Sequence, residues 1–329
     1  MNFEEDLPKM PITASLSAAI LPMTLYVFLI WRMDKYEPEP IKFVILHFLW
    51  GAVGAIILSV AGSALLGIAT GINGHTETEN TIQTIFFAPF AEEVAKGLLL
   101  LWTVNSKKFD NITDGIVYGT AIGFGFGMTE NFLYFVTYGD SAASWFYLVI
   151  VRSLFSAVMH GISTGTFGAV LGIAKYSNSF VRIFFPVFAL IFSMFIHFFW
   201  NAAVIFNGTY FYGFVFMIVL ITLFIGVIKL SIFNEKKIIE RELAEEVELG
   251  IIPQNYLPII STRLRLRKGW MDEQTRKIYF RTAIHLAFSK MKYKKVNTSR
   301  KQFYYNEIVQ YRIALKNIIE NQIQEVGIN

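Results

Sequence analysis

Long apolar runs dominate the first two thirds of the chain. A membrane-spanning helix needs about 20 predominantly apolar residues. The segments of that length are 13–31, 41–70, 81–104, 115–138, 145–174, 183–206 and 210–233. The pattern therefore predicts a helical bundle of about seven membrane spans. The first span is expected to stay in the chain, because the acidic start MNFEEDLPKM is followed by no small-residue cleavage site.

The loops between these segments alternate in charge. Lys and Arg side chains occur in loops 32–40, 105–114 and 175–182 and after residue 233, whereas loops 71–80, 139–144 and 207–209 have none. Cytoplasmic loops of membrane proteins are enriched in Lys and Arg. The alternation agrees with seven spans and predicts an outside N-terminus and a cytoplasmic C-terminus.

The last third of the chain has another pattern and another charge. Apolar positions repeat at helical spacing in FNEKKIIERELAEEVELG, MDEQTRKIYFRTAIHLAFSKMKYKK and SRKQFYYNEIVQYRIALKNIIENQIQ, and Gly250 is expected to end the first of these helices. The formal net charge is −3 over residues 1–233 and +7 over residues 234–329. We therefore expect two domains, a membrane bundle (1–233) and a small basic cytosolic helical domain (234–329). The latter is a solvated domain or a membrane-surface module, and it has no nucleic-acid motif.

Composition supports this division and limits the chemistry. Hydrophobic residues make up 54% of the 329 residues, charged residues make up 16%, and the mean hydropathy is +0.47. These values are too apolar for an ordinary soluble domain, so the expected fold class is an all-α polytopic membrane protein. The chain has no cysteine, which excludes disulfides, thiolate catalysis and cysteine metal ligands. A metal ion would need His, Asp or Glu.

Ionisable side chains interrupt four consecutive predicted spans, from the third to the sixth. An ionised side chain at the centre of a membrane helix costs about 2.5–3.5 kcal/mol. At 1.5 Å per residue from the outer end of each span, these groups lie about 12–22 Å deep. We therefore expect them to meet in one hydrated cavity, in the middle or outer half of the bilayer. The carboxylates and imidazoles concerned are Glu92, Glu93, Glu130, His160 and His197.

Spacing within the spans indicates which side chains share a helix face. Lys96 follows Glu92 by four residues, so the two can pair, while Glu93 lies about 100° round the helix. His197 and Asn201 are also four apart, which predicts an imidazole beside a carboxamide. Taken singly, each feature has a structural explanation, such as a buried ion pair. Their occurrence together in four neighbouring spans favours an active site.

The fourth span also has a ridge of glycines. In GIVYGTAIGFGFGMTENFLYF, glycine recurs at every fourth position from Gly115 to Gly127, and Glu130 follows the ridge. Small residues at this spacing let the backbone of a neighbouring helix approach closely. The ridge therefore predicts tight helix packing beside the cavity.

These residues carry a resemblance to a known family. The chain resembles the PrsW family of intramembrane proteases and, more distantly, the type II CAAX prenyl endopeptidases. The matching motifs are EEVAK (92–96), FGMTE (126–130), RSLFSAVMH (152–160) and HFFWN (197–201). The second motif of the CAAX enzymes ends in His where this chain has Glu130, which favours the PrsW side. The resemblance covers residues 81–206 and not the basic tail.

The resemblance implies an intramembrane endopeptidase of a bacterial plasma membrane. Its substrate would be a membrane-anchored protein resembling an anti-sigma factor, cut near the outer side of the membrane. Two mechanisms stay open. In one, a glutamate is the general base, and His and Asn stabilise the oxyanion. In the other, Zn²⁺ is held by His160, His197 and a carboxylate, for which Glu130 is the expected ligand, and another glutamate is the base.

The matching positions suggest a role for each remaining side chain. We expect Glu92 to be the base or a water-activating ligand, with Glu93 as its supporting carboxylate. Asn201 would donate to the oxyanion, and Lys96 and Arg152 would keep the carboxylates ionised. The oligomeric state is not predicted. Alternative functions are a proton- or ion-coupled transporter, which also needs Glu, His and Lys in a bundle interior, and a non-catalytic scaffold.

Overall fold

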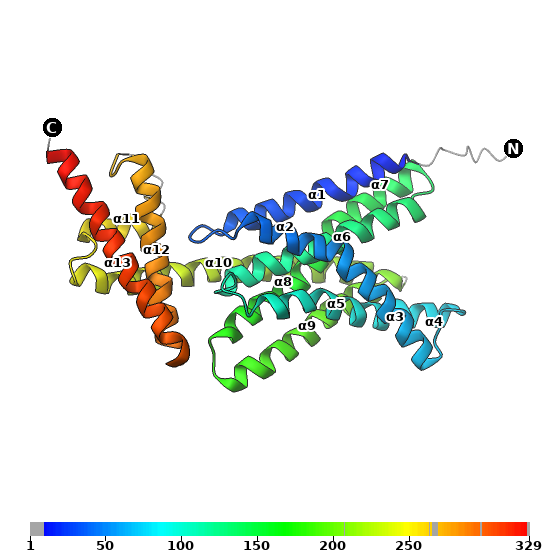
Figure 1. Cartoon of the computed structure of the whole chain (residues 1–329). Coiled ribbons are helices and arrows are strands. Elements are labelled where there is room, and N and C mark those ends of the chain that lie inside the picture. Colours follow the sequence, from blue (N-terminus) through cyan, green and yellow to red (C-terminus); the bar gives the residue numbers. More distant parts are fainter. Residues whose placement is uncertain (1–9, 207, 263, 265–268, 297, 328–329) are drawn as a thin grey trace. The chain divides into compact units, whose positions relative to one another are not determined.

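The chain is helical in the computed structural model, which describes residues 10–206, 208–262, 264, 269–296 and 298–327 (Figure 1). No strand occurs in these residues, so the predicted all-α class is confirmed. Most of the acidic start on which the signal-peptide expectation rests lies outside the described residues. The chain divides into two compact units, Met1–Asp34 with Pro38–Ile228, and Lys35–Glu37 with Lys229–Asn329.

The first unit consists of α-helices interrupted by three π-helical turns. Its elements are α1 (Ile12–Met33), α2 (Ile41–Leu49), the π-helix η1 (Trp50–Ala55), α3 (Ile56–Thr70), α4 (Glu77–Ile82), the π-helix η2 (Gln83–Phe87), α5 (Ala88–Thr103), α6 (Ile112–Tyr138), α7 (Ala142–Val151), the π-helix η3 (Arg152–Ser156), α8 (Ala157–Lys175) and α9 (Ser179–Ile205). The last helix, α10 (Tyr210–Glu248), continues into the second unit.

Five helical stretches in the described residues are long and apolar enough to cross a membrane. They are Ile12–Met33, Ile41–Thr70, Ala142–Lys175, Ser179–Ile205 and Tyr210–Glu248. The chain is therefore a multi-pass membrane protein. The segments predicted as the third and fourth spans are also helical, as η2 with α5 and as α6, but they are not among these five.

Helix α6 forms the centre of the first unit. Every residue from Thr113 to Gly127 is buried. A Cβ atom added at Gly119 would lie 2.4 Å from the carbonyl oxygen of Thr164, and one added at Gly123 would lie 2.2 Å from that of His160. The backbones of α6 and α8 therefore touch, and the tight packing predicted from the glycine ridge is confirmed. This packing brings His160 of α8 beside the part of α6 that carries Glu130.

The second unit has its own apolar core. After α10 it contains the 3₁₀ turn η4 (Gln254–Tyr256), α11 (Leu257–Ser261), α12 (Glu273–Lys295) and α13 (Thr298–Gly327). Gly250 has a φ of 68°, a left-handed conformation that favours glycine and that ends α10 as the sequence predicts. The fully buried apolar side chains of this core are Ile239, Leu243, Ile260, Tyr279, Ala283, Leu286, Ala287 and Leu315.

Candidate active site

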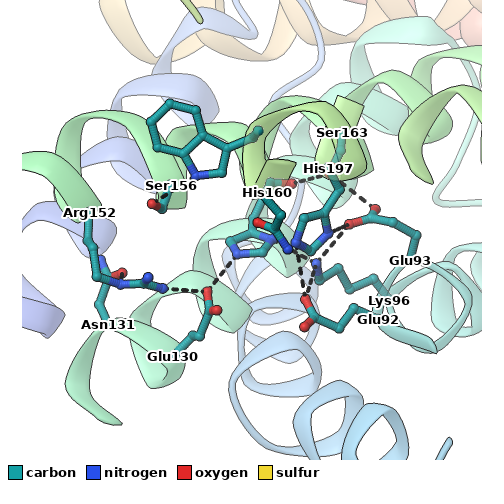
Figure 2. A network of polar contacts seen from close by, with 12 residues as sticks. Glu92, Glu93, Lys96, Glu130, Asn131, Arg152, Ser156, His160, Ser163 and His197 are labelled. Carbon is teal, nitrogen blue, oxygen red and sulfur yellow. Dashed lines mark hydrogen bonds and ion pairs between the residues drawn. The ribbon is translucent and has the colours of Figure 1, made fainter. Parts of the chain in front are cut away.

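Polar residues from five helical elements lie together inside the first unit (Figure 2). Glu92, Glu93 and Lys96 come from α5, Glu130 from α6, Arg152 from η3, His160 from α8, and His197 from α9. Lys96, Glu93 and both histidines are at most 2% exposed. The side chains of Glu92 and Glu130 are 13% and 22% exposed, so these two carboxylates lie at the accessible side of the cluster.

Lys96 links three members of the cluster. Its Nζ lies 2.8 Å from Oε1 of Glu93, 3.3 Å from Oε2 of Glu92 and 2.8 Å from Nδ1 of His160. An ammonium group has three hydrogens to donate, and three acceptors surround it here. The sequence predicts a pair with Glu92 alone, whereas the lysine reaches both carboxylates, because residues three and four positions away both face it on a helix.

The hydrogen bonds of His160 define which ring nitrogen carries the proton. An ammonium can only donate, so Nδ1 of His160 accepts from Lys96 and carries no hydrogen. The proton is then on Nε2, which donates to Oε2 of Glu130 at 2.7 Å. His160 is therefore engaged at both nitrogens.

His197 has a different arrangement. Its Nδ1 lies 3.1 Å from Oε1 of Glu93 and donates to that carboxylate, while its Nε2 lies 3.8 Å from Oε2 of Glu92. The rings of His160 and His197 meet edge to face, with centroids 4.8 Å apart. In this tautomer, Nε2 of His197 keeps a lone pair on the side of Glu92.

Ser163 is a member of the cluster that the sequence reasoning missed. Its Oγ lies 3.1 Å from both Oε2 of Glu93 and the carbonyl oxygen of His160, so these two acceptors share its hydrogen. Its own carbonyl oxygen accepts a 2.7 Å bond from the hydroxyl of Ser193. Both oxygens of Glu93 are thereby held, one by Lys96 and His197 and the other by Ser163. The available signal was the spacing from His160, since residues three apart share a helix face.

Arg152 lies against Glu130, at the more exposed edge of the cluster. Its guanidinium is 2.8 Å from Oε2 of Glu130, donates through Nε to Oδ1 of Asn131 at 3.1 Å, and stacks 3.5 Å over the ring of Tyr134. This places a permanent positive charge beside Glu130, as the sequence analysis expects for one of the carboxylates.

Asn201 contacts the backbone rather than the imidazole of His197. Its Nδ2 donates to the carbonyl oxygen of Thr84 at 2.9 Å. Thr84 lies in η2, where the N–H of Ala88 bonds five residues back to Gln83. The next residue, Pro89, has no N–H, so the carbonyl of Thr84 lacks this backbone donor. The carboxamide replaces it and fixes α9 to the turn that precedes Glu92.

The cluster contains a group of side chains suited to a metal ion. One atom each of Glu92, His160 and His197 lie within 4.8 Å of one another. Two imidazoles and a carboxylate form a common ligand set of catalytic zinc sites, which keep a further position for water. Glu93 holds the outer nitrogen of His197, as carboxylates do around metal-bound histidines. These residues fit a divalent metal, with Glu92 taking the ligand position that the sequence analysis gives to Glu130.

The comparisons with known proteins agree with this chemistry. The profile of a family described as PrsW family intramembrane metalloprotease matches residues 39–227. The curated protein named Protease PrsW from Bacillus subtilis (strain 168) is 28% identical over 190 residues, 56% of this chain and 79% of the relative. A protein of the same name from Geobacillus kaustophilus (strain HTA426) is 28% identical over 163 residues, which are 49% of this chain and 67% of the relative. No solved structure matches. The matched region includes every site residue and excludes the second unit beyond Ile228.

Proposed function

Because this chain belongs to the PrsW family of intramembrane metalloproteases, we propose that its buried cluster hydrolyses a peptide bond of a membrane-anchored protein near the outer face of the membrane. The observation that carries the proposal is the meeting of Glu92, His160 and His197 within 4.8 Å. A regulator of the anti-sigma-factor class, anchored by a span of its own, is the proposed substrate.

We assign the three converging residues as the holders of Zn²⁺. A bound zinc ion supplies an acidified water and a Lewis acid for the scissile carbonyl. His197 presents Nε2, because Glu93 holds its Nδ1–H. His160 has hydrogen bonds at both nitrogens, to Lys96 and to Glu130. His160 therefore has to give up one of these two hydrogen bonds to bind the metal ion.

Glu130 is the proposed proton carrier. It is the most exposed carboxylate of the cluster, and Arg152 keeps it ionised, so it can accept a proton from water and return it to the leaving amine. Asn201 uses one amide hydrogen on Thr84 and has a second one for the developing oxyanion. Lys96 and Ser163 hold Glu93 in place.

We also propose seven spans, with the N-terminus outside and the C-terminus in the cytoplasm of a bacterial plasma membrane. The two helices that carry the acidic motifs, α5 and α6, would be the third and fourth spans. Burial among the other helices supports this, since α6 is enclosed over most of its length. Residues 1–233 would then be the membrane domain and residues 234–329 a basic cytosolic domain.

Proteolysis by the purified protein tests the proposal. Full-length protein in detergent is mixed with candidate single-span proteins, and wild type is compared with Glu92→Ala and His197→Ala. Both variants should lose cleavage by more than about 1,000-fold, and a chelator should inhibit wild type until Zn²⁺ is restored. Glu77→Ala and His75→Ala change exposed residues of the same types and should cleave normally.

Two results would count against this assignment. Equal cleavage by wild type and both site variants would reject the site, and full activity after complete metal removal would reject the zinc. Thermal unfolding of each variant shows whether a loss of cleavage reflects misfolding. Activity in detergent, where no membrane potential exists, also separates a protease from an ion-coupled transporter.

A further inference from the structure

An apolar groove of about 190 Å³ lies between α1 and α2 in the first unit. Its floor includes Val44, which is 1% exposed, and its rims include Phe28 and Ile45, which are both 50% exposed. Thr24 also lines the groove, but its hydroxyl donates to the carbonyl oxygens of Ile20 and Leu21 in its own helix. Its hydroxyl hydrogen is therefore already used, and the groove offers a hydrocarbon surface.

One end of the groove has the features of a membrane interface. Trp31 lines it there, and its indole nitrogen donates to the carbonyl oxygen of Glu39 at 2.8 Å. Tryptophan is enriched where the bilayer meets water. The groove therefore runs from the headgroup level at Trp31 into the apolar region along α1.

Two cations flank this end. Arg32 follows Trp31, and its guanidinium lies 5.9 Å from the centroid of the Phe28 ring on the rim. Lys42 follows Ile41, which also lines the groove. Both cations are exposed, and no carboxylate pairs with either in the part of the chain that the structure describes. Two positive charges that no carboxylate neutralises in the described residues therefore lie beside an apolar groove.

We propose that this groove binds an acyl chain of an anionic glycerophospholipid, whose phosphate lies at Arg32 and Lys42. The hydrocarbon wall recognises the chain, and the two cations select an anionic headgroup, as basic pockets between membrane helices do. A zwitterionic lipid contacts the same hydrocarbon wall, but the two cations contribute less to its binding free energy. The site shares no residue with the catalytic cluster, so it is separate from the proposed proteolysis.

Native mass spectrometry of the full-length protein tests lipid selection directly. The detergent-solubilised protein is titrated with phosphatidylglycerol and, separately, with phosphatidylcholine of the same chains. Each cation should favour the anionic headgroup by about fivefold. Wild type should therefore bind phosphatidylglycerol about 30-fold more tightly than phosphatidylcholine. The double variant Arg32→Gln/Lys42→Gln should bind both lipids about equally. Ile45→Trp, which fills the groove, should bind both at least about tenfold more weakly than wild type.

Matched controls separate this site from general effects of charge and bulk. Lys108→Gln/Arg182→Gln removes two other exposed cations and should keep the wild-type preference. Ile57→Trp adds the same indole to another exposed apolar position, 62% exposed on α3, and should bind lipid normally. Equal binding of the two lipids by wild type would overturn the proposal. So would an unchanged preference in Arg32→Gln/Lys42→Gln, or controls that reproduce the losses.

Discussion

The Nζ of Lys96 lies 2.8 Å from Nδ1 of His160, so the cluster contains a cation of its own. The same ammonium contacts Glu92 and Glu93 and lies 3.9 Å from the centroid of the Phe126 ring. It thus neutralises part of the acidic charge in a place with little water. A metal ion bound through Nδ1 of His160 has to displace this internal cation.

Replacing Lys96 with glutamine should therefore affect metal binding and catalysis in opposite directions. Loss of the positive charge should strengthen zinc binding by about tenfold. The glutamine side chain is shorter than lysine and cannot donate to both Glu93 and His160, and loss of these bonds should lower kcat by about 100-fold. Metal affinity is measured by competition with a chromophoric chelator, and kcat by substrate cleavage. Lys175→Gln removes a lysine that bonds to backbone carbonyls elsewhere and should leave zinc affinity unchanged. Weaker zinc binding by Lys96→Gln would show that the Lys96 ammonium and the metal ion do not compete for His160.

Removing the hydroxyl of Ser163 should lower catalysis moderately. In Ser163→Ala, Oε2 of Glu93 loses its donor, so the carboxylate holds His197 less firmly. We expect kcat to fall by about tenfold with little change in KM, because Ser163 is buried and is expected to act through Glu93. Steady-state kinetics in detergent measures both constants. Ser17→Ala removes an exposed hydroxyl that bonds within its own helix, and equal losses in the two variants would argue against a positioning role.

A double substitution can separate the two roles given to Asn201. Asn201→Ala removes the donor to Thr84, so it should lower both the unfolding temperature and kcat. Adding Pro89→Ala supplies a backbone N–H near that carbonyl and should restore part of the unfolding temperature. The kcat of the double variant should stay low, because a backbone N–H cannot reach the oxyanion. Recovery of kcat together with stability would show that Asn201 only supports the fold.

Packing at the glycine ridge should be intolerant of even one methyl group. The Cβ atom of Gly123→Ala would lie 2.2 Å from the carbonyl oxygen of His160, so α8 has to move and carry its histidine with it. We expect a loss of more than about 2 kcal/mol of stability and no measurable cleavage. Gly226→Ala in α10 meets nothing within 4 Å and should be neutral or slightly stabilising. Thermal unfolding and cleavage of both variants provide the comparison.

The second unit should lose stability in acid through Glu245. Hydrogen bonds from Lys294 and Lys290 lower the pKa of this carboxyl from 4.5 to about 2. A lowered carboxyl pKa stabilises the fold above pH 4.5, and this contribution is lost as the pH falls towards 2. The reaction of a thiol-specific disulfide reagent with a cysteine placed at buried Ala287 reports opening of this unit. Opening should rise less steeply with acid in Glu245→Gln than in wild type, whereas Glu240→Gln should keep the wild-type dependence.

The residues of the candidate site can be identified from the sequence more readily than their contacts can. The cost of placing Glu92, His160 and His197 in apolar helices argues for their meeting, and the structure brings them together. Lys96 contacts Glu93 and His160 as well as the predicted Glu92. These further contacts depend on how far each side chain extends, which residue spacing does not determine. The contact of Asn201 with Thr84 depends on a π-helical turn, whereas a regular period of 3.6 residues was assumed. Ser163 was missed because one serine in an apolar helix usually bonds to its own backbone.

The π-helical turn η2 also decides where the chain before Glu92 can change its length. A π-turn holds one residue more than the α-helical turn it replaces. Losing one residue between Gln83 and Phe87 would therefore leave an ordinary α-helical turn, and Glu92 and Glu93 would keep their direction towards the two imidazoles. The same deletion in the regular part of α5, between Ala88 and Ala91, would rotate both carboxylates by about 100° and move them away from the imidazoles, although no residue of the cluster had changed. The extra residue of η2 thus lets this stretch lose length without disturbing the site.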